Sequence, residues 1–358
     1  MAGTRTMKRL TDNAYNRRVG RSDPKLKRWR YAGLMLTYQC PAQCALCYDN
    51  CGPDGGGLLD IETALDAWRS LCRLAEDSAR VHITGGEPFT MYDYLVELLA
   101  RAQAEGLGGL EDVETNAYWA HDAAEVRHRL QALDRVGLRR LKISCDPFHA
   151  EYIAPDRVRL LASVAREVLG PERVLVRWEK YLQAPVSFTE NAAERQCMIL
   201  AAVVDAPCRF TGRAAHEVAP WVAARSPDTW RGHDCRREIL GAKGVHVDPY
   251  GHVFSGLCSG IILGNVKDQP LDVLWEQFDP RREDLLGALF EGGPARLLES
   301  AVAAGYATRP RYADKCHLCT DVRQFFFDTG RHREIIGPCD CYLRRHAASL
   351  REVGIVEG

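Results

Sequence analysis

The sequence predicts an α/β fold built on a parallel sheet, and three observations lead to this prediction. From Tyr31 to about Gly212, short β-branched runs alternate with longer amphipathic stretches, which is the pattern of repeated βα units. Candidate functional residues fall just past the carboxyl ends of the expected strands, and a closed or partly closed parallel barrel gathers such ends on one rim. After Gly212 the βα pattern stops, which indicates a second, smaller α+β part.

Six βα units are expected, each beginning with a short strand. The expected strands are 31–38, 80–84, 110–115, 140–145, 173–178 and 199–210. Between the first two, apolar residues recur at helical spacing behind Asp60, a good N-cap residue. They are Leu65, Trp68, Leu71, Cys72 and Ala75. Cys72 is therefore expected in the core of the protein.

Composition and charge exclude several classes of protein. Apolar residues make up 46% and charged residues 27% of 358 residues, and no window approaches the length of apolar sequence that a membrane span needs. The net charge of -1 gives no reason to expect a nucleic-acid partner. The 14 cysteines fall in metal-like groups and no secretion signal precedes them, so a cytoplasmic protein is expected rather than a disulfide scaffold.

The first thirty residues form a basic segment. Ten Lys or Arg residues lie between Arg5 and Arg30, opposed only by Asp12 and Asp23. We expect a solvated, partly disordered arm. The alternative is a docking surface for an acidic partner peptide or a nucleic acid.

Cys40, Cys44 and Cys47 follow the first expected strand at the spacing C-x3-C-x2-C. Three thiolates within one tight loop can converge on one metal centre and leave one coordination position open. Soft thiolates are the ligands that iron-sulfur clusters select, although the spacing alone also allows a zinc knuckle.

A second motif, Gly85-Gly86-Glu87-Pro88, comes directly after the expected strand 80–84. The two motifs together resemble the radical S-adenosylmethionine (SAM) superfamily. The resemblance implies a partial (β/α)6 TIM-like barrel with a lateral gap, a 4Fe-4S cluster on the three cysteines, and SAM chelating the open iron. It also implies that the turn from Gly85 to Pro88 binds the SAM amino group through its backbone and through Glu87.

The same resemblance implies a reaction and further SAM contacts. An electron from a flavodoxin or ferredoxin-type donor cleaves SAM, and the resulting 5'-deoxyadenosyl radical abstracts a substrate hydrogen. Tyr48 matches an aromatic residue near the adenine, Ser144 a serine near the ribose and carboxylate, and Arg157 stands where it can pair with that carboxylate. Asn116 and Glu114 are candidates for the ribose or the substrate. For each, an ordinary packing or surface role is the alternative.

Three residues that leave the fourth expected strand are candidate catalytic groups. Cys145 could return a hydrogen atom to a substrate radical, and Asp146 or His149 could accept a proton during an oxidation. The alternative is a buried, inert cysteine. Arg209 and Arg213 could bind a carboxylate or a peptide, or be plain surface residues, and Gly52–Gly57 is interpreted as a flexible cover for the cluster.

A second metal centre is expected beyond the barrel. Residues 243–254 alternate around an Asp-Pro-Tyr-Gly turn, a hairpin pattern that brings Cys235 and Cys258 together. Cys316 and Cys319 add a C-x2-C pair. This arrangement resembles the twitch form of the SPASM auxiliary-cluster domain, which implies a second 4Fe-4S cluster; a structural zinc is the alternative. Cys339 and Cys341 are further candidate ligands, or replace one, or simply pack.

The predicted domains are a basic arm (1–30), a radical SAM barrel (31–215), a linker (216–234), an auxiliary-cluster domain (235–345) and a tail (346–358). The leading functional hypothesis is a radical SAM oxidoreductase that crosslinks, epimerises or oxidises a ribosomally synthesised peptide. The second is a dehydrogenase of a small alcohol or aminoglycoside-like metabolite. The third is a non-catalytic iron-sulfur or zinc protein.

Overall fold

The computed structural model contains one eight-stranded mixed sheet, and it describes residues 8–183, 191–205, 208–256 and 258–342. The strand order is β5-β4-β3-β2-β1-β6-β7-β8, in which β5 to β6 run parallel and β6, β7 and β8 are antiparallel neighbours. The strands are β1 Tyr31–Met35, β2 Arg80–Thr84, β3 Leu110–Thr115, β4 Leu141–Ser144, β5 Val174–Arg177, β6 Gly244–Val247, β7 His252–Ser255 and β8 Gly264–Asn265. The parallel strands form a partial TIM-like barrel, as the sequence predicts.

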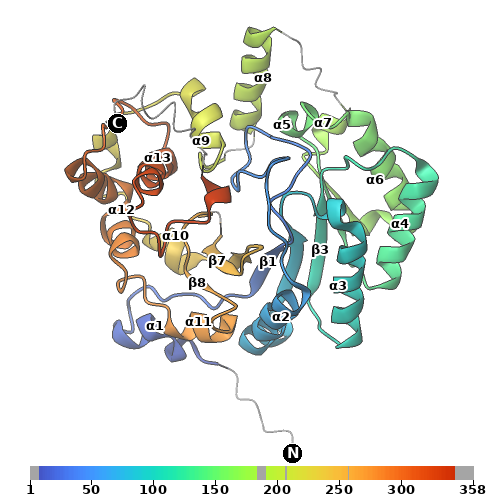
Figure 1. Ribbon diagram of the computed structural model, residues 1–358, viewed down its shortest axis with the longest axis horizontal. Helices are drawn as coiled ribbons and strands as arrows, with labels where there is room; N and C mark the ends of the chain where they lie inside the picture. Colours follow the sequence, from blue (N-terminus) through green and yellow to red (C-terminus); the bar gives the residue numbers. More distant parts are fainter. Residues whose placement is uncertain (1–7, 184–190, 206–207, 257, 343–358) are drawn as a thin grey trace, which may run out of the picture.

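Helices cover the outer side of this sheet, and the C-terminal part of the chain is mostly helical. In Figure 1, α2, α3, α4 and α6 follow one another beside the strands, whereas α10, α12 and α13 gather on the far side of β7 and β8. The helices are α1 Ala14–Arg18, α2 Ile61–Ala75, α3 Tyr92–Ala104, α4 Ala123–Arg135, α5 Pro147–Ala150, α6 Pro155–Leu169, α7 Lys180–Gln183, α8 Ala192–Asp205, α9 Ala214–Glu217, α10 Arg236–Gly241, α11 Leu271–Gln277, α12 Asp284–Ala303 and α13 Lys315–Asp328.

The sixth parallel strand is not where the sequence prediction placed it. Residues 199–205 lie in α8, and 208–210 form no strand. The sixth position is taken by β6, which pairs in parallel with β1 through Tyr31↔Gly244 and Leu34↔Val247. The predicted hairpin at 243–254 is present as β6 and β7, and it extends the barrel sheet. The division into domains stays a prediction.

Alternate residues of the parallel strands face two different environments. Leu34, Ile83 and Val113 are fully buried and face the helices. Helix α2, which covers this layer, begins after its N-cap residue Asp60, whose carboxylate accepts a hydrogen bond from Thr63 N. The intervening positions carry Gly33, His82 and Lys142, so the inner face of the barrel is polar. Cys72, predicted to be a core residue, is half-buried and packs against the core.

The basic segment is not a loose arm over the part that the structure describes. The amide of Asn13 donates to the carbonyls of Trp275 and Phe278 at 2.5 and 2.9 Å, and Trp275 Nε1 donates to Lys27 O at 3.0 Å. Leu26 and Trp29 are buried. The segment therefore packs against α11 around Asn13 and again from Leu26 to Trp29, whereas residues 20–24 between them are exposed.

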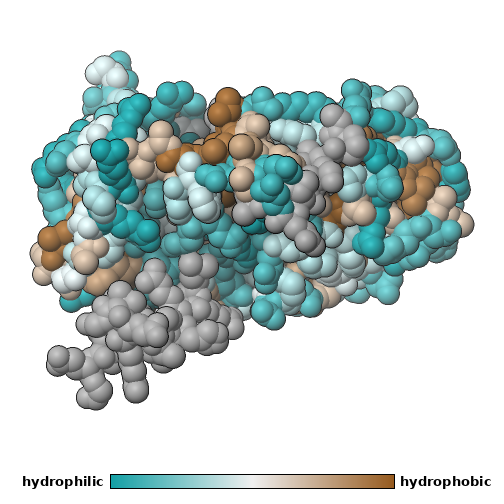
Figure 2. All heavy atoms as spheres, turned by 90° about the horizontal axis from the view of Figure 1, so that it is seen from above, coloured by the Kyte–Doolittle hydropathy of each residue, from teal (hydrophilic) through white to brown (hydrophobic). Residues whose placement is uncertain are grey.

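A groove beside the basic segment is lined mainly by lysine and arginine residues. It is lined by Leu10, Lys25, Leu26, Lys27, Arg28, Arg30, Ser78 and Lys243, none of them acidic. The alternative interpretation, docking of an acidic partner peptide or a nucleic acid, stays untested. Figure 2 shows a mostly hydrophilic face with hydrophobic residues in small groups. Among the described residues, no helix combines the length and apolar character that crossing a membrane requires.

Candidate active site

The loop that carries Cys40, Cys44 and Cys47 follows β1 and is held by a parallel backbone segment. Cys40 N donates to Gly52 O at 2.9 Å, and Tyr38 N donates to Gly56 O at 3.0 Å. Cys40 and Cys44 are buried, and Cys47 is half-buried. The glycine-rich segment 52–57 therefore pairs with the cysteine loop through its backbone, whereas a flexible cover was expected.

The glycine turn after β2 lies directly against this loop. Gly86 N donates to Thr37 O at 2.6 Å, and Glu87 N donates to Gln39 O at 2.9 Å. A Cβ atom on Gly86 would lie only 2.0 Å from Gln39 O, so a side chain at this position would push the turn away. Two motifs about forty residues apart in sequence thus meet next to Cys40, and the need for close contact explains the glycine.

Glu87 fastens the turn to the end of β3. Its buried carboxylate accepts from Phe89 N at 3.1 Å, Thr115 Oγ1 at 2.8 Å and Asn116 N at 2.6 Å. Burial raises the pKa of Glu87 to about 7. Two of these bonds go to Oε1 and one to Oε2, and a carboxylate has about four acceptor sites, so one remains on Oε2 for a ligand.

Polar groups surround each of the three thiols. The amide of Asn116 donates to Cys40 Sγ at 3.5 Å. A hydrogen bond with the Cys51 thiol and the charge of Arg213 lower the pKa of Cys47 to about 6. Burial alone would lower the pKa of His149, but the neighbouring Asp146 and Cys44 raise it well above the ordinary value. The surroundings of Cys47 therefore favour its thiolate, the form that an iron-sulfur cluster binds, whereas burial raises the pKa of Cys40.

Arg213 holds the cysteine loop in place instead of reaching for a carboxylate or peptide. Its guanidinium donates to the carbonyls of Cys44, Asn50 and Cys51 at 2.8 to 3.0 Å, and it is buried. Neighbouring Gly212 has φ +55°, and a Cβ there would lie 2.4 Å from Tyr48 O. The sequence prediction of a ligand-binding or surface arginine was wrong, because these contacts are with backbone that no spacing rule reveals.

The three candidate catalytic residues line one small cavity past β4. Cys145, Asp146 and His149 share it with Ser144 and Tyr181, and it measures about 10 Å³. That volume holds at most about one water molecule. Burial raises the pKa of Cys145 to about 11, and Asp146 is hydrogen-bonded to the ring Nδ1 of His149. The cavity brings the three residues together but has no room for a substrate.

The remaining SAM candidates lie around the same loop. Arg157 Nη1 donates to Tyr118 O at 2.6 Å, and Tyr118 N donates to Asn116 Oδ1 at 3.0 Å, so Arg157 reaches the segment after β3. The ring of Tyr48 lies 6.2 Å from the ring of His246. Tyr48 thereby connects the cysteine loop with the barrel interior.

Three polar residues inside the barrel, Lys142, His82 and His246, were missed by sequence reasoning, whereas their neighbour Glu114 was a candidate. Lys142 pairs with Glu114, which also accepts from Thr84 Oγ1 at 3.0 Å. The rings of His82 and His246 meet edge to face at 5.5 Å. Burial lowers the pKa of His246 to about 4, so the ring is neutral. Alternation of polar and apolar residues within 81–84 and 141–144 was the available signal, because a strand buried on both faces would be apolar throughout.

The four cysteines of the expected second centre line one cavity of about 50 Å³. Cys235 precedes α10, Cys258 follows β7, and Cys316 and Cys319 lie in the first turns of α13. Polar residues that also line it include Arg209, Thr211, Glu238, Lys315 and Arg323. Burial raises the pKa of Cys235, Cys258 and Cys316, and the neighbouring thiols add to the rise.

The donors in this cavity fit a cluster. Four thiols match the ligand set of a closed 4Fe-4S cluster or of zinc. Arg323 Nε and Thr211 Oγ1 are buried and have no hydrogen-bond partner within the described residues. Among those same residues, no three His, Cys, Asp or Glu side chains converge closely enough to hold a single metal ion.

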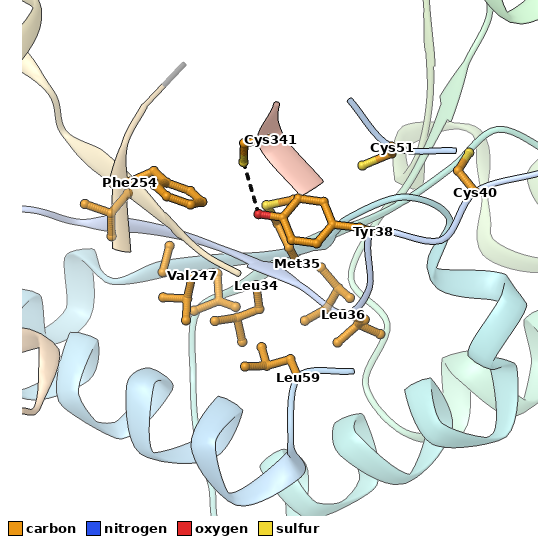
Figure 3. Close-up of a cluster of buried hydrophobic side chains, with 14 of the residues drawn as sticks. Leu34, Met35, Leu36, Tyr38, Cys40, Cys51, Leu59, Val247, Phe254 and Cys341 are labelled. Atoms are coloured by element: carbon orange, nitrogen blue, oxygen red, sulfur yellow. Dashed lines mark hydrogen bonds between the residues drawn. The ribbon is translucent and has the colours of Figure 1, made fainter. Parts of the chain in front are cut away.

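Cys339 and Cys341 do not line the four-cysteine cavity. Figure 3 shows the Cys341 sulfur directed at the Tyr38 hydroxyl, at 3.4 Å. Cys341 is buried, and the Cys339 thiol donates to Asp340 Oδ2 at 3.5 Å near the surface. The structure therefore separates these two thiols from the four others and places Cys341 beside the cysteine loop.

Comparisons with known proteins found likeness in solved structures alone. No family model matches the sequence, and no curated protein matches it. The structure of BtrN in complex with AdoMet and 2-DOIA is 13% identical, with a TM-score of 0.45 over 75% of this chain and 90% of that one. Native anSMEcpe with AdoMet and the Cp18Cys peptide is 11% identical, with a TM-score of 0.40 over 84% of this chain and 97% of that one.

A third structure, Streptococcus suis SuiB bound to the precursor peptide SuiA, is 12% identical, with a TM-score of 0.32 over 89% of this chain and 77% of that one. At these identities and TM-scores, the function has to be argued from the residues of this chain.

Proposed function

We propose that the chain is a radical SAM enzyme whose first cluster is held by Cys40, Cys44 and Cys47. The observation that carries the proposal is the contact of the Gly85–Glu87 turn with Gln39, next to Cys40. It places a carboxylate with a spare acceptor site beside three thiols that leave one coordination position open. When bound, the cluster and SAM supply a 5'-deoxyadenosyl radical that abstracts a hydrogen atom from the substrate.

The residues around the loop have distinct proposed roles. Gly85, Gly86, Glu87 and Pro88 hold the amino end of SAM, and Tyr48, Asn116, Ser144 and Arg157 are its other candidate contacts. Asn116 also stabilises the Cys40 thiolate by donating to its sulfur. Asp146 orients His149, which lies against Cys44, so we assign His149 to the support of that ligand. A hydrogen-donor role for Cys145 would require its small cavity to open.

For the second centre, we propose one auxiliary 4Fe-4S cluster on Cys235, Cys258, Cys316 and Cys319. A cluster with four protein ligands leaves no iron open, which favours electron transfer over substrate binding. An external flavodoxin or ferredoxin-type protein is the proposed electron donor. Cys339 and Cys341 are left out of the ligand set because they lie outside the four-cysteine cavity.

The proposed reaction is an oxidoreductase modification of a ribosomally synthesised peptide. A partial barrel leaves a lateral opening that accepts a chain-like substrate. A second candidate is the dehydrogenation of a small alcohol or aminoglycoside-like metabolite, and the polar barrel interior favours it. Glu114, Lys142, His82 and His246 offer acceptors and donors that suit hydroxyl or amino groups.

The deciding experiment measures 5'-deoxyadenosine formed from SAM by reduced, cluster-reconstituted protein. The wild-type chain should form the product, and the triple variant C40A/C44A/C47A should lower its yield to background. The proposal fails if the two proteins give the same yield. The substrate class is then tested with two kinds of candidate: precursor peptides that neighbouring genes encode, and polyols that the products of neighbouring genes make. A change in the mass of a candidate identifies it as a substrate.

A further inference from the structure

The two cysteine sites are connected by a short series of buried polar groups. Ser259, the residue after Cys258, donates its hydroxyl to Asp49, two residues after Cys47. The carbonyl of Ser259 in turn accepts from Arg323 Nη1 at 2.9 Å. Asp49, Ser259 and Arg323 are all buried. Arg323 therefore lies between the four-cysteine cavity and the cysteine loop.

Arg323 shares one face of α13 with two of the proposed ligands. It follows Cys316 by seven residues and Cys319 by four, and residues at these spacings stack along one side of a helix. Its exposed fraction is 3%, and it lines the cavity with the four thiols.

One nitrogen of this guanidinium, Nε, has no hydrogen-bond partner among the described residues. Nη1 also donates to the Tyr342 hydroxyl at 3.1 Å, and Nη2 donates to Thr320 Oγ1 at 3.4 Å. Nε is buried without a partner within the described residues. A buried donor left without an acceptor costs about 1–3 kcal/mol, so an acceptor belongs in the cavity.

Arg323 differs from the other two cations around the cavity. Lys315 is paired with Glu238 at 2.9 Å, so a carboxylate offsets its charge. Arg209 is exposed, where water and salt screen it. The contacts of the Arg323 guanidinium are with a carbonyl, hydroxyls and an aromatic ring, all of them neutral. Its full positive charge therefore acts on the cavity in a medium of low dielectric constant.

We propose, resting on the auxiliary cluster assigned above, that Arg323 donates Nε–H to a sulfur of that cluster and raises its reduction potential. Reduction adds one negative charge to the cluster, and a fixed buried cation stabilises the reduced form more than the oxidised one. Hydrogen bonds to cluster sulfurs act in the same direction. Arg323 thereby makes the auxiliary cluster a better electron acceptor.

The first test is redox titration of the auxiliary cluster followed by electron paramagnetic resonance. It is carried out in the C40A/C44A/C47A background, so that the signal comes from the auxiliary cluster alone. R323Q should shift the midpoint potential to a more negative value, and R323K should shift it less because the charge is kept. R236Q is the matched control: Arg236 follows Cys235 but is exposed, so the potential should stay at the background value.

The outcomes separate this proposal from the one on which it rests. If the C40A/C44A/C47A protein binds zinc, or if it contains neither iron nor sulfide, the auxiliary cluster itself is refuted. If C40A/C44A/C47A holds a full cluster and adding R323Q leaves its midpoint potential unchanged, the role of Arg323 is refuted.

A second measurement keeps the test decisive if R323Q does not hold its cluster. The C40A/C44A/C47A protein carrying ¹⁵N-labelled arginine should show a weak ¹⁵N coupling to the reduced cluster in pulsed electron paramagnetic resonance. R323K should lose this coupling. Absence of the coupling in the protein that retains Arg323 would overturn the proposed hydrogen bond.

Discussion

The cysteine loop and the four-cysteine cavity hold their thiols in opposite ways. Cys40, Cys44 and Cys47 lie within eight residues of sequence, and backbone contacts with the Gly85 turn and Arg213 fix the loop. The four cavity cysteines come from three separate segments, which the fold brings together. The first site is thus a local structure mounted on the barrel, whereas the second connects distant parts of the chain.

This difference predicts that metal binding contributes more to folding at the second site than at the first. The largest effect is expected from C316S/C319S, which should lose the auxiliary cluster, about 4 of about 8 iron atoms per chain. It should also lower the melting temperature more than C40A/C44A/C47A does. Iron analysis and thermal unfolding measure both effects.

The variant C339S/C341S is the control for that experiment. Because both thiols lie outside the cavity, iron content should equal that of the wild-type chain. A loss of iron in C339S/C341S, or equal melting temperatures in the two ligand variants, would contradict the distinction between the sites.

A single methyl group should damage the first site and spare the second. In G86A the new Cβ would meet Gln39 O at 2.0 Å, so the turn must move away from the loop. Overpacking of this kind costs about 1–3 kcal/mol, which corresponds to a loss of 5'-deoxyadenosine formation of roughly 5-fold to 150-fold. G108A is the matched control, because a Cβ on Gly108 meets nothing within 4 Å. Equal activity of G86A and G108A would show that the close contact is not required.

A smaller effect is expected from R213K. Lysine keeps the charge, but it lacks the planar guanidinium that donates to the carbonyls of Cys44, Asn50 and Cys51 at once. About 1–3 kcal/mol of local stabilisation should therefore be lost. The first cluster should then release iron to a chelator several times faster. R209K, on the same segment but exposed, should release iron at the wild-type rate. Equal rates in the two variants would mean that Arg213 does not secure the loop.

The cysteine motifs and the hairpin were predictable because their information is local. Spacing placed three cysteines in one loop, and the turn between β6 and β7 placed Cys235 near Cys258. The sixth strand was not predictable, because β6 pairs with β1 across about two hundred residues. The run from Ile199 to Val204 contains β-branched residues but lies in the second half of helix α8, and short apolar runs do not distinguish a strand from a helix.

The basic segment and the buried arginines show a second limit. Asn13 looks like a solvent residue in sequence, yet its amide is buried against carbonyls of the segment around α11. Arg213 and Arg323 look like surface cations, yet each is enclosed by backbone and hydroxyl partners. Charge and hydropathy describe a side chain by itself, whereas these positions are decided by which acceptors the fold places around it.

Gly33 sets the depth of the barrel interior. A Cβ at this position would lie 2.2 Å from His246 Cδ2 and 2.7 Å from His82 Nε2, so the two imidazoles rest over β1 only because residue 33 has a hydrogen atom there. Any larger residue would have to displace both rings from β1. How closely the two imidazoles approach β1 is therefore governed by the smallest side chain in the barrel wall.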